Sequence, residues 1–175
     1  MATDRPSSSS DFSEYAAANW TQLVRSARLL GARPADAEDL VQITLAKCFV
    51  SWHRVTSAHD TDAYVHRILI NTWRRSMRRL WHREIPTDLS HKDLESLPES
   101  DRDLEALAVQ TALSRLPEHL RAVLVLRRYV DLSVEQTAEA LGIPAGTVKS
   151  RLSRAQAAFR SDAEIARLIS EVSDD

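Results

Sequence analysis

Apolar residues recur at spacings of three and four along most of this chain, which is the period of an amphipathic helix. In the first such stretch the repeating positions are Phe12, Tyr15, Ala16, Leu23, Ala27 and Leu30. Asp11 can cap this helix, and Gly31 ends it. The pattern predicts helices over residues 12–30, 34–52, 61–81, 103–115, 118–129, 134–141 and 145–160. Only three glycines and six prolines are present, too few for the turns of a sheet protein, so we expect an all-α fold.

Residues 84–105 break this pattern. They carry eight acidic residues, two basic residues and two prolines, a composition typical of a solvated linker. We therefore expect two small helical domains joined by this acidic, flexible linker. The predicted segments are a disordered Ser-rich N-terminus at 1–10, a first domain at 11–83, the linker at 84–105, a second domain at 106–160 and an acidic tail at 161–175.

Composition narrows the class of protein. Lys and Arg number 23 against 25 Asp and Glu, which excludes a uniformly basic protein but not charge segregated along the chain. The longest apolar run has five residues, Ala122 to Leu126, whereas a membrane span needs about 20. The N-terminus lacks the apolar stretch of a secretory signal. One cysteine, Cys48, forms neither an internal disulfide nor a Cys-based zinc site. We expect a soluble, cytoplasmic protein without a metal or other cofactor.

The second helix has two apolar faces. The core face is expected to hold Val41, Leu45, Cys48, Phe49 and Trp52, with Cys48 acting as a small apolar side chain. Ile43, Ala46 and Val50 fall on nearly the opposite face, beside Asp39. A helix at a domain surface is normally polar there. Either another helix of this domain covers the second face, or a partner protein binds it.

The third helix is strongly basic. From Arg67 to Arg83 there are six arginines and no acidic residue. The outward stripe consists of Arg67, Asn71, Arg74 and Arg78, flanked by Arg75 and Arg79, with Tyr64 at its upstream end. Arginine forks bind phosphates or guanine, and aromatic rings such as Tyr64, Trp73 and Trp81 can stack on unpaired bases. The alternative is a solvated basic face, although such faces usually mix signs. The histidines have no spacing typical of metal ligands, and we expect surface positions for His53, His59, His66 and His82.

The segment LSVEQTAEALGIPAGTVKSRLSRAQAAF predicts a helix-turn-helix. Ser133 and Gln136 have the spacing of a capping box, and Gly142 ends the first short helix. The predicted buried positions are Val134, Ala138 and Leu141, then Val148, Leu152, Ala155 and Phe159. Small and basic residues near the start of the second helix suit entry into a DNA major groove. An ordinary αα-hairpin is the alternative, but it does not need a basic exposed face.

Three segments together resemble the bacterial extracytoplasmic-function (ECF) sigma factors. DAEDLVQITLAKCFVSW resembles the core-polymerase-binding region of that family, and AYVHRILINTWRRSMRR its −10 recognition and melting region. ALSRLPEHLRAVLVLRRYVDLSVEQTAEALGIPAGTVKSRLSRAQ resembles the −35-binding region. The match covers about residues 12–160 in the family's order, and the Asn-Thr-Trp run resembles a mainly actinobacterial subgroup. One departure is Ile43, where the family often has an acidic residue.

The resemblance implies an alternative sigma factor that binds core RNA polymerase, melts the −10 element and recognises the −35 element, with no catalysis of its own. The implied polymerase contacts are Asp36, Asp39, Leu40, Gln42, Ile43, Ala46 and Val50. The implied −10 contacts are Tyr64, Arg67, Asn71, Trp73, Arg74, Arg75, Arg78 and Arg79. The implied −35 contacts are Thr147, Lys149, Ser150, Arg151, Ser153 and Arg154. Core polymerase and promoter DNA are the expected partners, and an anti-sigma factor is a further candidate.

Two other classes of function compete with this interpretation. A stand-alone helix-turn-helix regulator needs neither the two-faced second helix nor a separate basic helix. A metal-dependent nuclease could use Asp36, Glu38 and Asp39 as ligands, but no His or Cys cluster accompanies them. A helix N-terminus already explains these acids, because negative charge there suits the helix dipole.

Overall fold

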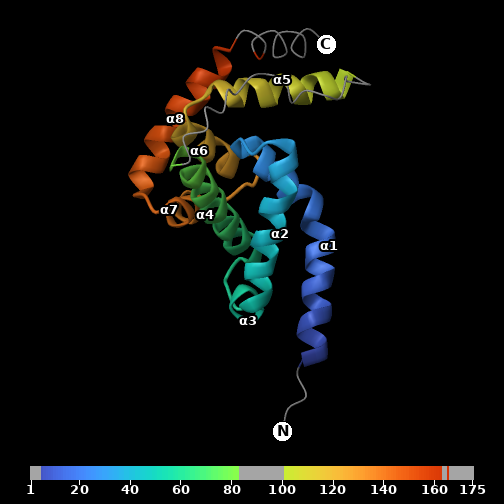
Figure 1. Ribbon diagram of the computed structural model, residues 1–175. Helices are drawn as coiled ribbons and strands as arrows, with labels where there is room; N and C mark the ends of the chain where they lie inside the picture. The colour runs from blue at the N-terminus through green and yellow to red at the C-terminus, as the bar shows by residue number, and fades with distance from the viewer. Residues whose placement is uncertain (1–4, 83–100, 163–164, 166–175) are drawn as a thin grey trace. The chain divides into compact units, whose positions relative to one another are not determined.

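The computed structural model describes residues 5–82, 101–162 and Ile165, and these ranges contain helices and no strand, as predicted (Figure 1). Side chains are described from Ser9 to Arg78, from Ala106 to Asp162 and for Ile165. Among the described residues, the first compact unit comprises 5–28, 32–82 and 139–142, and the second comprises 29–31, 101–138, 143–162 and Ile165.

The first unit contains α1 (Arg5–Leu30), α2 (Pro34–Val50), the short α3 (Trp52–Thr56) and α4 (Thr61–His82). Helix α2 packs along α4, and α3 contacts both. The buried side chains that hold these helices together include Leu23, Ala27, Val41, Leu45, Cys48, Val55, Val65, Leu69 and Trp73. Burying one large aliphatic side chain contributes about 1.5–3 kcal/mol, so this core sets the orientation of α2 and α4.

Helix boundaries follow the local sequence. Pro34 occupies the first turn of α2, where its missing N–H costs nothing. Asp60 caps α4, because its Oδ1 accepts a hydrogen bond of 2.9 Å from the backbone N–H of Ala63. Gly31 ends α1 with a φ of +106°, which a glycine adopts without strain.

Helix α1 begins earlier than predicted. Residues 5–10, expected to be disordered, are helical, so Asp11 lies inside α1 and does not cap it. Pro6 falls in the first turn, where proline is tolerated, and no residue between it and Phe12 breaks the helix.

Aromatic side chains attach the first half of α1 to the rest of the first unit. The ring of Phe12 lies 5.3 Å from that of Trp52, and the ring of Tyr15 lies at the same centroid distance from Trp52. The Tyr15 hydroxyl donates a 2.7 Å hydrogen bond to Oδ1 of Asp62, in the first turn of α4.

Cys48 is fully buried, and burial raises the pKa of its thiol to about 11, so it packs as a neutral apolar group, as predicted.

The second unit contains α5 (Asp101–Arg115), α6 (Glu118–Arg128), α7 (Val134–Leu141) and α8 (Ala145–Arg160). Helices α6 and α8 pack against each other around Val123, Leu126, Val148 and Ala155. The predicted linker at 84–105 lies outside the described residues as far as position 100. Its last five residues already belong to α5.

Candidate functional site

The side of α2 that faces away from α4 is apolar and open to solvent. Ile43 is 50% exposed, Val50 is 84% exposed, and Ala46 between them is exposed as well. Asp39 and Gln42 are exposed at the N-terminal end of the same face. No described residue of the first unit covers these side chains. Of the two interpretations left open by the sequence, the structure therefore favours a surface for a partner protein.

Two residues of α2 occupy positions different from those predicted. Leu40, expected at the polymerase contact, is only 4% exposed, because it falls on the core side of the helix. Its role is to support the helix from inside. Phe49, expected in the core, is 52% exposed and packs its ring 5.0 Å from that of Phe12. Phe49 thus widens the exposed apolar surface toward α1.

Asp36 is partly exposed in the first turn of α2, at the end of the helix from which Asp39 and Gln42 follow. Its Oδ2 accepts a 2.6 Å hydrogen bond from Nε of Arg33. An exposed ion pair of this kind contributes at most about 1 kcal/mol to stability. A cationic group of a partner protein can therefore pair with Asp36 in place of Arg33 with little loss of free energy.

The outward side of α4 carries the basic residues that the sequence indicated. Asn71, Arg75 and Arg78 are exposed, and each lies on the side of the helix away from Leu69 and Val65. The guanidinium of Arg67 lies over the ring of Tyr64, 5.9 Å from its centroid. This contact keeps an aromatic face and a cation together at the upstream end of the stripe. The side chain of Arg79 lies outside the described residues.

Trp73 does not belong to this outward surface. It is fully buried among the core side chains of the first unit, so it cannot stack on an unpaired base. The resemblance implied a DNA contact for Trp73, and its burial contradicts that role. Tyr64, which is partly exposed, remains as the described aromatic candidate for stacking. The side chain of Trp81 lies outside the described residues.

A lysine that the sequence did not single out connects α2 with α4. Nζ of Lys47 donates a 2.7 Å hydrogen bond to Oγ1 of Thr72, which is buried in the basic helix. Helices α2 and α4 therefore share a polar contact as well as their apolar core.

His66 is buried between α1 and α4, contrary to the surface position expected from the sequence. Its Nδ1 lies 2.9 Å from the backbone oxygen of Asp62, and its Nε2 lies 3.3 Å from Oγ of Ser26. A carbonyl oxygen only accepts, so Nδ1 carries the hydrogen and Nε2 accepts from the Ser26 hydroxyl. Burial lowers the pKa of His66, against the opposing effect of Asp62 and Asp60. Burial therefore favours the neutral form of the ring in the folded protein.

The turn between α7 and α8 has the predicted geometry. The backbone N–H of Gln136 donates to Oγ of Ser133 at 3.0 Å, and the backbone N–H of Ser133 donates to Oε1 of Gln136 at 2.6 Å. This reciprocal pair confirms the capping box. Gly142 has a φ of +64°, and the next N–H, that of Ile143, donates to the oxygen of Ala138 at 3.0 Å. The helix thus ends in a Schellman motif and the chain turns directly into α8.

Helix α8 presents polar side chains away from the core of the second unit. Val148 and Ala155 are buried, whereas Leu152 and Phe159 are partly buried. The side chains of Lys149, Ser150, Ser153 and Arg154 are exposed, and those of Thr147 and Arg151 are partly exposed at the edges. In α7 the buried residues include Thr137, Ala140 and Leu141, so Val134 and Ala138 are only half-buried, at the edge of the core.

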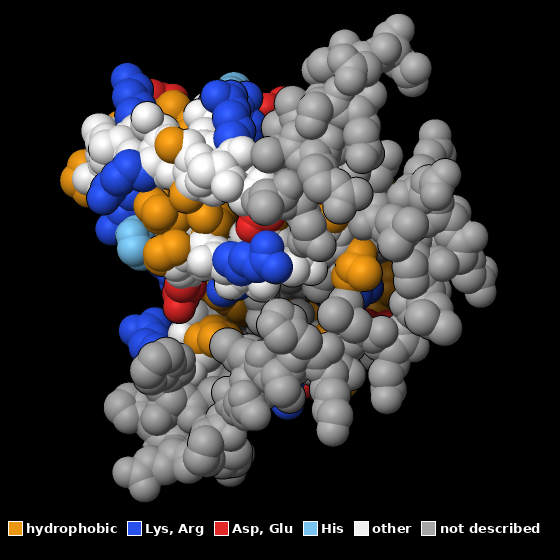
Figure 2. Space-filling model, turned by 90° about the horizontal axis from the view of Figure 1, so that it is seen from above, with side chains coloured by type: hydrophobic (Ala, Val, Ile, Leu, Met, Phe, Trp, Pro, Cys, Tyr) orange, Lys and Arg blue, Asp and Glu red, His pale blue; other side chains and the backbone are white. Residues whose placement is uncertain are grey.

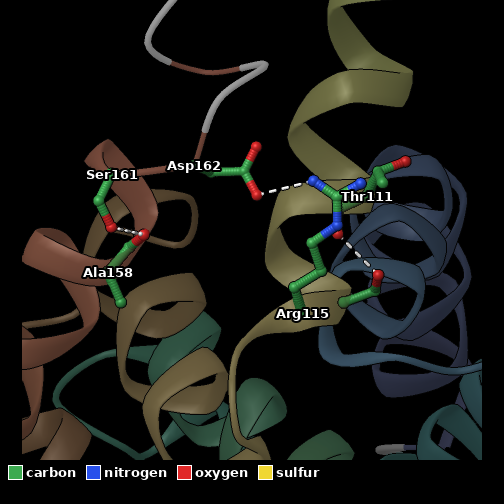
Figure 3. Close-up of polar contacts among 6 residues, drawn as sticks. Thr111, Arg115, Ala158, Ser161 and Asp162 are labelled. Carbon is green, nitrogen blue, oxygen red and sulfur yellow. Dashed lines mark hydrogen bonds and ion pairs between the residues drawn. The ribbon is translucent and has the colours of Figure 1, made fainter.

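The segment after α8 closes the second unit (Figure 3). Nη1 of Arg115, in the last turn of α5, donates to Oδ2 of Asp162 at 2.9 Å, and Asp162 is almost completely buried. Ile165 is buried too. The Ser161 hydroxyl donates to the backbone oxygen of Ala158 at 2.9 Å (Figure 3). The beginning of the predicted acidic tail is therefore part of the folded unit.

The described residues contain no group of three or more His, Cys, Asp or Glu residues that could hold a metal ion. They also include no helix with the length and apolar character needed to cross a membrane.

Comparison with known proteins identifies both units. Residues 15–83 match sigma-70 region 2, and residues 106–158 match sigma-70 region 4. The chain is 38% identical over 158 residues to the RNA polymerase sigma-E factor of Streptomyces coelicolor, covering 87% of this chain and 85% of that protein. It is 36% identical to the ECF sigma factor SigM of Mycobacterium tuberculosis, over 78% of this chain and 68% of SigM.

A solved structure shares the same fold. The sigma factor RpoE from Bartonella quintana, crystallised with the anti-sigma factor NepR, matches with a TM-score of 0.74 at 26% identity. The match covers 86% of this chain and 94% of RpoE. The order of helices, the two matched regions and the identities with curated sigma factors agree with one another. The chain belongs to the ECF group of the sigma-70 family of RNA polymerase sigma factors.

Proposed function

We propose that this sigma factor docks on core RNA polymerase through the exposed face of α2, opens the −10 element with α4 and holds the −35 element with α8. The observation that carries the proposal is the uncovered apolar face of Ile43, Ala46 and Val50 on a helix whose other side packs on the basic helix. One helix thereby presents a protein-binding surface and supports a DNA-binding surface.

The first DNA contact is assigned to the outward side of α4. Opening a base pair costs a few kcal/mol. This cost is offset when the unstacked bases stack on aromatic side chains and their phosphates bind cationic side chains. Tyr64 and Arg67 supply one such pair at the upstream end, and Asn71, Arg74, Arg75 and Arg78 follow along the helix. Because Trp73 is buried, the proposal assigns stacking to Tyr64.

The second DNA contact is assigned to α8. The residues proposed to reach the −35 element are Thr147, Lys149, Ser150, Arg151, Ser153 and Arg154. A helix-turn-helix inserts the start of its second helix into the major groove, and these residues lie in the first ten positions of α8. Figure 2 shows blue Lys and Arg side chains at several places on the described part of one face, among orange, white and some red acidic side chains.

The protein needs no catalytic residue or cofactor for these roles, since polymerase supplies the chemistry. We place it in the cytoplasm, where core polymerase and promoter DNA are found. One matched structure contains RpoE bound to the anti-sigma factor NepR. Another contains CnrH bound to the cytosolic domain of a second protein, CnrY. An anti-sigma factor is therefore a candidate partner of this chain.

A stand-alone helix-turn-helix regulator is the competing function. It would bind its DNA site without polymerase, whereas the proposed sigma factor needs core polymerase to open a promoter. Permanganate reactivity of a promoter fragment with the protein alone, core alone and both together separates the two. Reactive thymines only in the combined sample support the proposal, and sequence-specific binding by the protein alone without any opening favours the regulator.

A further inference from the structure

Arg128, the exposed last residue of α6, is joined to α8 by its side chain. The amide of Gln156 satisfies its neighbours only when its oxygen faces Arg128. In that orientation the oxygen accepts hydrogen bonds from Nε of Arg128 at 2.9 Å and from Nη2 of the same guanidinium. Both residues belong to the second unit. The guanidinium of an α6 residue is therefore fixed against the side of α8.

Gln156 lies in one row with two residues that are proposed to reach the −35 element. Lys149, Ser153 and Gln156 follow one another at spacings of four and three, so they are neighbours along the helix surface. Lys149 and Ser153 are exposed, whereas Gln156 is partly buried, so the row borders the core of the second unit. Because it binds Gln156, the guanidinium of Arg128 extends this row, although α6 supplies it.

The charge of Arg128 is not neutralised at this position. An amide is uncharged, so the hydrogen bonds to Gln156 orient the guanidinium without cancelling its charge. In the part of the chain that the structure describes, Arg128 forms no ion pair, and α8 contains no acidic residue. Arg160, four positions after Gln156, is exposed as well. Lys149, Arg128 and Arg160 thus give this edge three cations, which suits a phosphate backbone.

The position of Arg128 in the chain also fits a contact with the DNA backbone. Helix α6 directly precedes the two helices of the helix-turn-helix, and Arg128 lies where α6 leads into the turn before α7. In the homeodomain, a three-helix variant of the helix-turn-helix, the loop between the first two helices and the end of the third helix contact the backbone. Arg128 and Gln156 lie at the corresponding places.

We propose that Arg128 binds a backbone phosphate beside the −35 element, so that α6 adds a sequence-independent contact to those of α8. The proposal rests on the function proposed for α8. Gln156 is the positioning residue, because it holds the guanidinium at the edge of α8. It engages two of the five guanidinium N–H groups, which leaves three for phosphate oxygens.

The test measures how capture of a −35 duplex by holoenzyme depends on salt. Holoenzyme is assembled from the full chain and saturating core polymerase, and the duplex carries only the −35 element of a promoter found by run-off transcription. Four variants are compared with wild type: Arg128→Gln, Arg128→Lys, Gln156→Met and, as a matched loss of one exposed charge on α1, Arg25→Gln. In a second set of duplexes, single phosphates around the −35 element are replaced by neutral methylphosphonates.

A phosphate contact on duplex DNA contributes about 0.9 to the slope of log affinity against log salt concentration. We expect Arg128→Gln to reduce the slope by about this amount, equally on duplexes that differ in −35 sequence. Arg128→Lys and Arg25→Gln should keep the slope. Gln156→Met should keep it too and lose less affinity than Arg128→Gln, because the cation is present but no longer held. One methylphosphonate should weaken binding of wild type and have no further effect on Arg128→Gln.

An unchanged slope for Arg128→Gln overturns the proposal. A Gln156→Met variant that loses as much slope and affinity as Arg128→Gln overturns it as well, because Arg128 would then only support α8. The same holds if every methylphosphonate weakens wild type and Arg128→Gln equally.

These three results leave the proposed function standing when Arg154→Ala weakens capture of the same duplex. If Arg154→Ala and Arg128→Gln both bind it like wild type, the proposed function of α8 and the Arg128 contact fail together.

Discussion

The hydroxyl of Ser26 and the ring of His66 meet in the core of the first unit, with Oγ and Nε2 3.3 Å apart. Ser26 belongs to α1 and His66 to α4, so the contact joins the first helix to the helix that carries the basic stripe. It requires a neutral imidazole, because a protonated Nε2 no longer accepts the hydroxyl hydrogen.

This contact predicts that stability decreases in mild acid. The pKa of His66 is lowered in the folded protein, whereas an unfolded histidine titrates near its ordinary value of about 6.5. The unfolded state therefore binds the proton more readily. The His66 contribution is complete above about pH 6.5 and is lost as the pH falls below it, by at most about 1.4 kcal/mol per pH unit. Urea unfolding followed by circular dichroism between pH 7.5 and 5 measures it, and His66→Gln should flatten the profile. Parallel profiles for the two proteins would contradict the assignment.

The exposed face of α2 predicts a class of variants that fold but do not bind polymerase. Ile43→Lys and Val50→Lys place a charge on an apolar surface that a partner must desolvate, so affinity for core polymerase should fall at least about tenfold. Helix content should be unchanged, because both positions are exposed. Ala17→Lys, on an exposed position of α1, is the control. Core affinity is measured by competition in a pull-down, and wild-type affinity of both α2 variants would refute the assignment.

The two proposed DNA surfaces predict separable defects. Arg74→Ala and Arg78→Ala should impair opening at −10, and Arg154→Ala should impair capture of −35, each by about 1–3 kcal/mol if an arginine fork to a base is lost. Permanganate footprinting reports opening, and a duplex carrying only the −35 element reports capture. Arg28→Ala on α1 is a matched control. Loss of opening by Arg154→Ala on a template already held at −35 would show that the division is wrong.

The capping box of α7 predicts a stability effect within the second unit. Ser133→Ala removes the acceptor of the Gln136 N–H and should cost about 0.5–2 kcal/mol. Ser114→Ala, at an exposed position where the hydroxyl bonds only within its own helix at Thr111, should cost less. Thermal unfolding compares the two variants. Equal melting temperatures would mean that the cap contributes nothing to the helix-turn-helix.

Short-range patterns predicted most of this fold. Proline at the start of α2, the Ser133–Gln136 spacing and Gly142 act within a few residues, so the sequence alone places helix ends there. The second apolar face of α2 was predicted for the same reason, because 100° per residue separates Ile43 and Val50 from the core side. The sequence left open whether another helix covers this face, and the structure leaves it exposed.

Several of the errors concern contacts between elements. Histidine is a polar residue that the sequence placed on the surface, and only the position of His66 opposite Ser26 explains its burial. Phe49 lies at the edge of the core face of α2. How much of its ring is buried depends on where Phe12 of α1 packs against it. Lys47 and Thr72 are 25 residues apart, and no local pattern pairs them. Asp162 looked like part of a solvated tail because its partner, Arg115, belongs to another helix.

Run-off transcription with purified core polymerase on genomic fragments tests the central claim most directly. We expect discrete transcripts that require both core polymerase and this protein, with the Ile43→Lys variant and the Arg154→Ala variant each strongly reduced. Promoter-specific transcripts that are unaffected by both variants, or a complete absence of transcripts with an active core enzyme, would contradict the account.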